Sequence, residues 1–262
     1  MPGSQTTDAP HGRVALGMSG GVDSSVAVAA LAAEGYEVVG VTLVLRDAPD
    51  ARDAARAAAK VCARLGAEHR VVEAAAAFDA AVVAPFAAAY GAGLTPSPCV
   101  GCNAAVKLPL LVAAADEAGC AHVATGHYAR VGALADGRYA VLAGLDHGKD
   151  QSYMLAALTQ GQLARLVLPL GGMTKLAVRA AAAEMGLACA DAPESQDICF
   201  APAGYRALLA ERGVRAEPGP ILPRDGREVG RHTGLSDYTV GQRKGIGVAG
   251  PEPYYVLEKR LA

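Results

Sequence analysis

Tryptophan is absent from this 262-residue sequence, and aromatic residues make up only 5% of it. Charged residues are also few, at 19%, whereas hydrophobic residues reach 52%, a balance that excludes a disordered chain. No run of about 18 apolar residues free of charge occurs, and residues 1–12 lack the apolar core of an export signal. We therefore expect a soluble globular protein of the cytoplasm, with no membrane segment and a flexible tail over residues 1–12.

Charge and cysteine usage narrow the class further. The net charge of −2 disfavours nonspecific coating of nucleic acid, but residues 205–262 hold ten Lys/Arg against seven Asp/Glu, net +3. That excess is either an ordinary solvated surface or a patch for an anionic partner. Six cysteines without an export signal are expected to be thiols, ligands or catalysts rather than a disulfide framework. Cys62, Cys120 and Cys189 have apolar or alanine-rich neighbours and are predicted to be small core residues.

Short apolar stretches alternate with helical patterns over the first half of the chain. The predicted strands are residues 13–18, 37–45, 69–73 and 121–126, and the predicted helices are residues 22–35, 50–66, 75–90 and a segment from an Asn103 cap toward Gly119. Strands alternating with helices are typical of a parallel sheet covered on both faces. The sequence therefore predicts an α/β fold with a doubly wound parallel sheet.

The pattern changes toward the C-terminus. Residues 148–210 are mostly helical in pattern, and from about Glu217 the chain becomes rich in glycine and proline with short β-type runs. This shift predicts a catalytic domain over residues 13–210 and a small β-rich domain over residues 211–262. Within the small domain, Arg243 and Lys244 are the preferred contacts for nucleic-acid phosphates, with a plain turn as the alternative.

A glycine-rich turn separates the first strand from the first helix. It reads Ser19-Gly20-Gly21-Val22-Asp23-Ser24-Ser25, so backbone N–H groups and a helix N-terminus converge where an anion would sit. The serines can donate hydroxyls to phosphate oxygens, and Asp23 is a candidate for holding Mg²⁺. The turn has neither the Walker spacing nor the dinucleotide spacing of glycines. It resembles the pyrophosphate loop of the N-type ATP pyrophosphatases, the adenine nucleotide alpha hydrolase-like superfamily. That resemblance implies cleavage of ATP to AMP and pyrophosphate by adenylation of an acceptor oxygen.

The stretch "PSPCVGCN" limits which acceptor substrate the adenylation could serve. It places Cys99 and Cys102 three residues apart in a turn-rich segment. A zinc site would need a second Cys-x-x-C or a nearby His pair, and the sequence has neither. Cys199 follows in "ESQDICF" about a hundred residues later. Replacing an activated carbonyl oxygen by sulfur requires a carried sulfur nucleophile, whereas delivering an amine requires no thiol.

The sequence resembles the bacterial tRNA-specific 2-thiouridylase family in six blocks that occur in the family's order. These are "GMSGGVDSS", "CN" with Lys107 downstream, "TGHYAR", "GKDQSYML", "SQDICF" and "HTGLSDYTVGQRKGIGV". The resemblance runs from Arg13 to the C-terminus. It implies adenylation of O2 of the wobble uridine of tRNA, followed by sulfur transfer from a cysteine persulfide that a donor protein has loaded. The tRNAs implied are those for Lys, Glu and Gln.

The same resemblance implies roles for individual residues. Cys199 would carry the persulfide and Cys102 would be its catalytic partner, closing a transient disulfide. The implied ATP-binding residues are Gly17, Met18, Ser19, Gly20, Gly21, Val22, Asp23, Ser24, Leu43 and Gly126. The implied tRNA contacts are Ser97, Pro98 and Cys99 at the target base, together with His127, Lys149, Asp150 and Gln151. A strand-end brace is the alternative for His127, and a solvated helix start is the alternative for residues 149–151.

The sequence departs from the family pattern in several places. It ends at Ala262, where the family normally adds a C-terminal β-barrel, so we expect a short form without that barrel. Ser97 stands where the family usually has Asn, and the segment after Leu45 is shorter. Two other functions stay open: thiolation through an iron–sulfur cluster on Cys99, Cys102 and Cys199, and a non-catalytic protein that binds tRNA or a sulfur-relay partner.

Overall fold

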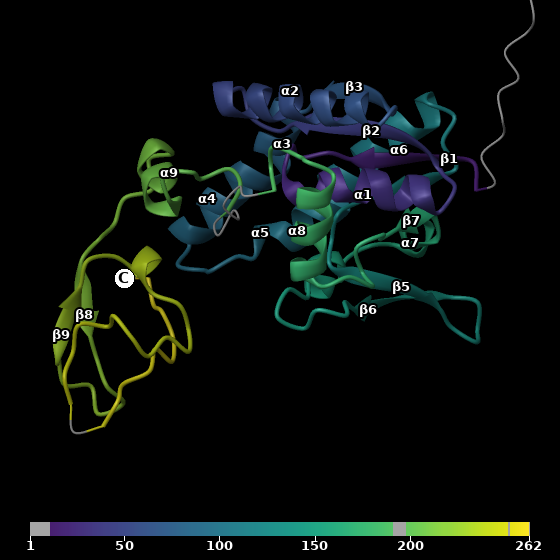
Figure 1. Ribbon diagram of the computed structural model, residues 1–262. Coiled ribbons are helices and arrows are strands. Elements are labelled where there is room, and N and C mark those ends of the chain that lie inside the picture. The colour runs from purple at the N-terminus through teal and green to yellow at the C-terminus, as the bar shows by residue number, and fades with distance from the viewer. Residues whose placement is uncertain (1–10, 191–197, 251, 262) are drawn as a thin grey trace, which may run out of the picture. The chain divides into compact units, whose positions relative to one another are not determined.

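The computed structural model describes residues 11–190, 198–250 and 252–261 (Figure 1). The chain divides into two compact units. The larger unit comprises residues 1–79 and 99–194, and the smaller unit comprises residues 80–98 and 195–262. The larger unit contains the parallel sheet.

Five strands form that sheet, all parallel, in the order β3-β2-β1-β4-β7. Their bounds are β1 Arg13–Gly17, β2 Glu37–Val44, β3 Glu68–Glu73, β4 His122–Ala124 and β7 Leu166–Val167. The central strand β1 pairs with β2 on one side and with β4 on the other. The strand order therefore reverses direction between β1 and β4, and the predicted doubly wound α/β fold is confirmed.

One face of the sheet is covered by α1 (Val22–Ala33), α2 (Pro49–Arg64) and α8 (Lys175–Glu184). Figure 1 shows α2 lying along β2 and β3. Strand β1 turns Val14 and Leu16 toward this face, and both are fully buried in a cluster with residues of all three helices. Burying an aliphatic side chain of this size contributes about 1.5–3 kcal/mol.

The opposite face is covered by α6 (Leu108–Glu117), whose Leu108 and Leu111 pack in one cluster with Ala15 of β1. Successive residues of β1 thus enter cores on opposite sides of the sheet, because side chains alternate along a strand. A strand buried on both faces has no polar side, which explains why the predicted strands are continuous apolar runs.

The helix that carries the two neighbouring thiols is continuous over Pro98–Glu117. It consists of α5 (Pro98–Cys102), a π-helical turn (Asn103–Lys107) and α6. Among the described residues, this is the one helix that is long and apolar enough to cross a membrane by length and composition alone. Its C-terminal half packs on the sheet, which accounts for the apolar composition.

The prediction that Asn103 caps this helix is wrong. The helix begins at Pro98, and Asn103 is 1% exposed inside it. The Nδ2 group of Asn103 donates to the carbonyl oxygen of Met154 at 3.2 Å. Proline suits the first turn of a helix because its missing N–H would have no partner there, so Pro98 starts the helix instead.

Residues 148–210 are less helical than predicted. Their described part holds a 3₁₀ turn (Ser152–Leu155), α7 (Gln160–Arg165), β7, α8 and the start of α9 (Tyr205–Glu211), joined by extended segments. Two further strands, β5 (Ala129–Ala133) and β6 (Tyr139–Ala143), pair antiparallel as a separate hairpin of the larger unit. The helical pattern failed where "VLPLGG" interrupts it, because proline and glycine disfavour helix interiors.

The smaller unit combines α4 (Ala84–Gly91) and α9 with a hairpin of β8 (Gly219–Ile221) and β9 (Gly230–His232). Within the described residues this hairpin is its one β-ladder, so the region is less β-rich than its pattern predicted. An aromatic cluster joins the helices to the chain around Cys199. Its ring pairs, with centroids 4.9 to 5.2 Å apart, are Phe86–Tyr90, Phe86–Phe200 and Tyr90–Tyr205.

Candidate functional site

The turn after β1 has the geometry of an anion-binding loop. Gly20 has φ +76°, in the left-handed region that favours glycine, and a Cβ there would lie 2.7 Å from the carbonyl oxygen of Ala54. Gly21 is the N-cap of α1 and supplies no side-chain cap. The first intrahelical bond runs from Ser25 N to Gly21 O at 3.2 Å, so the preceding N–H groups of the first turn face outward. The positive end of the helix dipole is thus open to a phosphate.

The loop serines have different surroundings. Ser25 is fully buried and donates from Oγ to the Gly21 carbonyl at 2.8 Å, which holds the turn in place. Ser24 is also buried, and its Oγ donates to the same carbonyl at 3.1 Å and lies 3.2 Å from the Oγ of Ser19. Ser19 is exposed. Ser25 is therefore a brace, whereas Ser19 is the hydroxyl that an incoming ligand meets first.

Three predicted nucleotide residues meet at the carboxyl ends of neighbouring strands. Gly17 is the last residue of β1, Leu43 is the penultimate residue of β2, and Gly126 follows β4 by two residues. A Cβ on Gly126 would lie 3.3 Å from Ser24 N and 3.5 Å from Asp23 Cβ, so its backbone lies directly against the first turn of α1. The switch point of the sheet lies at the carboxyl ends of β1 and β4, the place where open α/β sheets bind ligands.

Asp23 has two partners that the sequence reading missed. Both of its carboxylate oxygens lie 2.7 Å from Lys175 Nζ, and the Tyr128 hydroxyl donates to Oδ1 at 2.7 Å. Lys175 is 9% exposed and Tyr128 is 2% exposed. Lys175 lies 152 positions from Asp23 in an ordinary helix start, so no local pattern signals the contact.

His127 is neutral at ordinary pH. Burial, assisted by the positive charge of Lys107, lowers the pKa of His127 to about 4. Its Nδ1 lies 2.7 Å from the Oγ1 of Thr125, a hydrogen bond that fixes the ring. A neutral imidazole held in this way can accept or donate one hydrogen bond without carrying charge.

Two residues of the predicted tRNA segment bond within the protein. Asp150 Oδ1 accepts from Gly144 N at 2.9 Å, and Oδ2 accepts from the Ser152 hydroxyl at 2.7 Å, bonds that lower the pKa of Asp150. Gln151 bonds Tyr128 through both side chain and backbone, at 3.1 and 2.9 Å. These contacts hold the segment against the chain that follows Gly126, and Lys149 is half-buried beside them.

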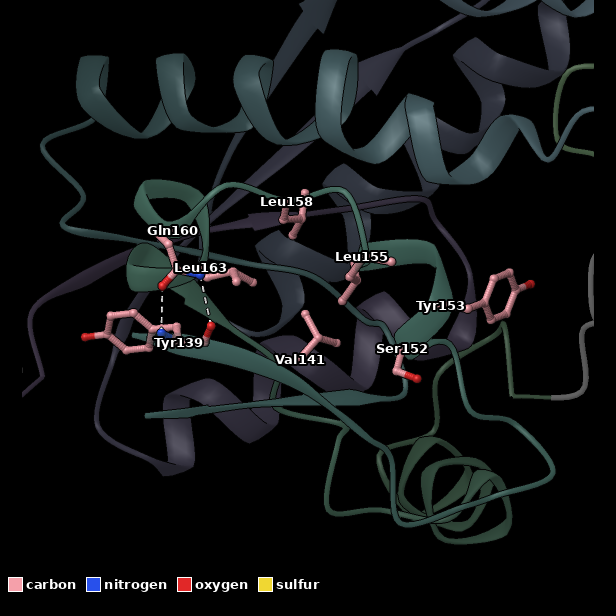
Figure 2. Close-up of a pocket in the computed structure, with 9 residues that line it drawn as sticks. Tyr139, Val141, Ser152, Tyr153, Leu155, Leu158, Gln160 and Leu163 are labelled. Carbon is pink, nitrogen blue, oxygen red and sulfur yellow. Dashed lines mark hydrogen bonds between the residues drawn. The ribbon is translucent and has the colours of Figure 1, made fainter. Parts of the chain in front are cut away.

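A pocket of about 460 Å³ opens immediately after this segment. Figure 2 shows aliphatic side chains between Tyr139 on one side and Tyr153 on the other, with Gln160 bonded to the backbone of Tyr139. It is lined by Tyr139, Val141, Ser152, Tyr153, Leu155, Ala156, Leu158, Gln160 and Leu163. None of the predicted ATP-binding residues lines it, so this pocket is separate from the phosphate loop.

The cysteines differ in exposure. In the larger unit Cys102 is 4% exposed and Cys99 is half-buried, one helical turn apart on the helix that starts at Pro98. In the smaller unit Cys199 is exposed, and the next residue, Phe200, is buried against Phe86. Ser97, just before the helix, is exposed.

Two of the predicted core cysteines are confirmed as such. Cys62 and Cys120 are both buried, and burial raises the pKa of Cys62 to about 11 and raises that of Cys120 as well. Neither is therefore a thiolate at neutral pH. Cys189 is partly buried, with its Sγ 3.6 Å from the Oγ of Ser25.

Arg243 and Lys244 lie exposed on a braced loop of the smaller unit. Gln242 accepts from Thr239 N at 2.9 Å and donates to the Lys244 carbonyl at 2.9 Å, and the buried Ile246 fixes the far side of the loop. The two cationic side chains are thereby presented to solvent from a held backbone.

The fold and the loop define a HUP-type α/β domain with an open phosphate-binding turn. The family model described as "tRNA methyl transferase HUP domain" matches residues 12–203, and that described as "tRNA methyl transferase PRC-barrel domain" matches residues 207–262. The chain belongs to the tRNA-specific 2-thiouridylase family, MnmA, because relatives of that name match nearly its whole length.

Three of these relatives show how far the similarity extends. The Xanthobacter autotrophicus protein is 49% identical over 94% of this chain and 66% of its own length. The Sorangium cellulosum protein is 50% identical over 94% and 66%, and the Chloroflexus aurantiacus protein is 48% identical over 93% and 71%. The chain thus spans about two thirds of the length of the relatives it matches. Among solved structures, the U34-tRNA thiolase NcsA from Methanococcus maripaludis is 19% identical over 80% of this chain and 66% of its own, with TM-score 0.46.

Proposed function

We propose that the protein catalyses ATP-dependent 2-thiolation of the wobble uridine of tRNA. The observation that carries this proposal is the uncapped N-terminus of α1, which opens beside Gly126 at the switch point of the sheet. The named relatives, which are tRNA-specific 2-thiouridylases, support the same reaction. The descriptions of the matching family models name methyl transfer, a reaction that gives no role to the thiols in "CVGCN" and "DICF". Sulfur transfer gives these thiols a role.

The nucleotide would bind at the carboxyl ends of β1 and β4, where the strand order reverses. The loop from Gly17 to Ser24 would hold the phosphates through backbone N–H groups, with Leu43 and Gly126 beside the adenosine. Asp23 fits a Mg²⁺ ion, because its carboxylate is a hard oxygen donor and its side chain is 34% exposed. When bound, Mg²⁺ would offset the charge of the phosphates.

The chemistry proceeds in three displacements. First, O2 of the uridine attacks the α-phosphorus of ATP, and pyrophosphate leaves. Next, the terminal sulfur of the Cys199 persulfide attacks C2, and AMP leaves with the former O2. Cys102 then attacks the Cys199 sulfur as a thiolate, which breaks the S–S bond and leaves the new sulfur on C2. A cellular thiol reduces the resulting disulfide between Cys102 and Cys199, and a sulfur donor protein reloads Cys199.

The tRNA would be recognised by both units. Cys99 would face the target base together with the two residues that precede it, Ser97 and Pro98. In the larger unit, neutral His127 would accept or donate a hydrogen bond to the tRNA. Residues 149–151 would contact the anticodon arm through Lys149 and the held backbone. In the smaller unit, the exposed Arg243 and Lys244 would contact phosphates. The family resemblance points to the tRNAs for Lys, Glu and Gln and to the cytoplasm as the site of action.

Nucleoside mass spectrometry tests the proposal. The chain is expressed in a bacterial host that lacks its own 2-thiouridylase, and 2-thiouridine is measured in purified tRNA. We expect the modification to appear with the wild-type chain and to fall below detection with Cys199→Ala. A soluble wild-type chain that binds tRNA and leaves it unmodified, with a sulfur donor supplied, would instead indicate the non-catalytic binding protein.

A second mechanism for the same reaction uses Cys99, Cys102 and Cys199 as thiolate ligands of an iron–sulfur cluster. Three thiolates suit a cluster with one open iron, and the first two lie one turn apart on a single helix. Cys99 separates the mechanisms. If Cys99→Ser retains 2-thiouridine formation and the wild-type protein prepared without oxygen lacks iron, the persulfide mechanism holds. Iron in the wild type that is lost together with activity in Cys99→Ser would establish the cluster.

A further inference from the structure

Strand β6 is held at both ends by side chains from the chain that returns alongside it. At one end the Gln160 amide pairs with the backbone of Tyr139, accepting from its N–H at 2.7 Å and donating to its carbonyl at 3.0 Å. Figure 2 shows this clamp as dashed lines beside the pocket of about 460 Å³. At the other end, Asp150 Oδ1 accepts from Gly144 N at 2.9 Å. The chain between the two clamps supplies one wall of the pocket, and the middle of β6 supplies another.

The middle of β6 presents backbone hydrogen-bonding groups to this pocket. In an antiparallel pair, alternate residues turn both backbone groups toward the partner strand or away from it. Leu134 N donates to the Arg138 carbonyl at 2.7 Å across the hairpin. Gln160 pairs with Tyr139 from outside, so Tyr139 and, two residues on, Val141 face away from β5. The N–H and C=O of Val141 thus lie on an outer edge that borders the pocket, and among the described residues no side chain or loop bonds to them.

The open part of this edge is one residue long. Two residues toward the hairpin turn, Gln160 occupies Tyr139. Two residues the other way, Arg130 Nε donates to the Ala143 carbonyl at 3.0 Å. A peptide strand of ordinary length pairs with several alternate residues, so it does not fit an opening of one. A planar group with an adjacent donor and acceptor fits, as the Gln160 amide already does at Tyr139, and nucleobases carry such a pair on their hydrogen-bonding edges.

The rest of the lining suits a flat, uncharged ring. Aliphatic side chains form most of it, and Tyr139 and Tyr153, which are 36% and 55% exposed, add two aromatic rings. Unpaired bases stack on aromatic rings in RNA recognition. Among the described residues that line the pocket none is Lys or Arg, so a free nucleotide would find no cation for its phosphate. The lining therefore favours a base on a polymer held elsewhere, and Lys149 of the proposed tRNA segment comes three residues before Ser152 of the lining.

We propose that this pocket binds one unpaired nucleobase of the substrate tRNA, a different base from the uridine that is modified. The base would pair with the N–H and C=O of Val141 and stack on a tyrosine ring. This inference rests on the proposed function and adds a recognition site to it. The modified uridine is excluded as the occupant because its O2 has to reach the nucleotide, and none of the proposed ATP-binding residues lines the pocket. The pocket thus helps to determine which tRNA is bound.

The first test fills the pocket from its exposed side. Ala156 lines the pocket and is exposed, so Ala156→Trp places a ring in the opening without disturbing the core. We expect tRNA to bind roughly 5- to 100-fold more weakly to this variant, the range for losing one stacked base, and ATP to bind as to the wild type. Ala157→Trp, at the next residue, which is exposed and outside the lining, is the matched control and should bind both as the wild type does. Equal tRNA affinities for the two variants would overturn the proposal.

The second test identifies the base and leaves the wild-type chain unchanged. Each unpaired nucleotide of a substrate tRNA is made abasic in turn, and one position besides the wobble uridine should weaken binding by a similar factor. That abasic tRNA should bind Ala156→Trp as well as the intact tRNA does, because the contact is already lost. A nonpolar isostere of the same base should bind the wild type about 2- to 10-fold more weakly, since Val141 loses its hydrogen bonds. Abasic losses that persist in full in Ala156→Trp at every position would contradict the proposal.

A double tyrosine variant guards against misfolding of the tryptophan variant. Tyr139→Ala/Tyr153→Ala removes both exposed rings, so tRNA should bind at least threefold more weakly, whereas Tyr139→Phe/Tyr153→Phe keeps the rings and should bind as the wild type does. Equal tRNA affinities for these two variants would overturn stacking in the pocket. A wild-type chain that binds no tRNA would overturn the proposed function. Formation of 2-thiouridine by the wild type, together with normal tRNA binding by Ala156→Trp, would overturn this inference alone.

Discussion

The two units hold their candidate functional residues by different means. In the larger unit the glycine loop, Leu43 and Gly126 sit at the ends of parallel strands, where the backbone of the sheet fixes their positions. In the smaller unit Cys199 and the exposed cations lie on irregular segments secured by a few anchors, such as Phe200. A sheet edge suits a small rigid ligand, whereas anchored loops suit a carried sulfur and a large, variable polymer. Substitutions in one unit should therefore leave the binding function of the other intact.

Removing an anchor of the smaller unit should have the largest effect on stability. Phe200 is 6% exposed and packs edge-to-face on Phe86, so Phe200→Ala should cost about 3–5 kcal/mol. Amide hydrogen exchange of α4 and α9 measures this loss, and 2-thiouridine formation should fall at least tenfold because the chain around Cys199 loses its attachment. ATP binding should not change. Tyr255→Ala, at a 52% exposed residue, should alter stability by less than about 0.5 kcal/mol. A parallel loss of ATP binding in Phe200→Ala would contradict the separation.

Substitution of Gly20 in the phosphate loop should be nearly as destabilising as substitution of Phe200, but for a different reason. Gly20→Ala places a Cβ 2.7 Å from a backbone oxygen at positive φ, which should cost about 2–4 kcal/mol and weaken ATP at least tenfold. Gly137 also has positive φ, but its Cβ would meet open space. Gly137→Ala should therefore cost about 1 kcal/mol and leave ATP affinity unchanged. Isothermal titration and urea unfolding check both, and equal ATP affinities for the two variants would refute the steric argument.

The free energy of unfolding should depend on pH through the protonation of His127. Its pKa is about 4 in the folded protein and near the ordinary 6.5 when unfolded, so the unfolded chain binds more protons between these values. The contribution of His127 to the free energy of unfolding should be fully present above pH 6.5. It should fall by at most about 1.4 kcal/mol per pH unit toward pH 4. In His127→Gln this part of the slope should disappear, as measured by urea unfolding across that range.

The smallest effect is expected from replacing the exposed cations of the smaller unit, Arg243 and Lys244. Arg243→Gln/Lys244→Gln should weaken tRNA binding about tenfold at most and reduce the slope of log K against log salt by roughly 1 to 2. ATP binding should be unaffected. Filter binding at several salt concentrations measures the slope, with Arg56→Gln/Lys60→Gln on α2 as a charge-matched control. An identical slope for wild type and the Arg243/Lys244 variant would mean that these residues do not contact phosphate.

Much of the larger unit could be predicted from sequence because it is buried on both faces. Strands β1, β2 and β3 lie within one or two residues of their predicted bounds. Strands β1 and β2 are buried, continuous apolar runs, which leave little choice of structure. The two-residue β7 was missed because so short a strand has no periodicity, and it lies where a helical pattern was predicted. Asn103 was placed at a helix start because its residue type favours caps, yet burial and the bond to Met154 determine its position.

The site was predictable only where its residues are close in sequence. The loop from Ser19 to Ser25 forms one local motif, so its residue types and order indicated an anion site. The ion pair of Asp23 with Lys175 joins residues that only the packing of α8 against α1 brings together. Likewise, nothing in "GKDQ" shows that the side chains of Asp150 and Gln151 bond to the protein itself.

The π-helical turn at Asn103–Lys107 separates one helix into two parts that can vary independently. An extra residue in that turn offsets the face of α5 from the face that α6 presents to the sheet. The residue type at position 99 can therefore change, for example between a thiol and a carboxylate, without repacking Leu108 or Leu111 in the core. The fold thus permits the residue type to change at one helical turn while the half of the helix that packs on the sheet stays unaltered.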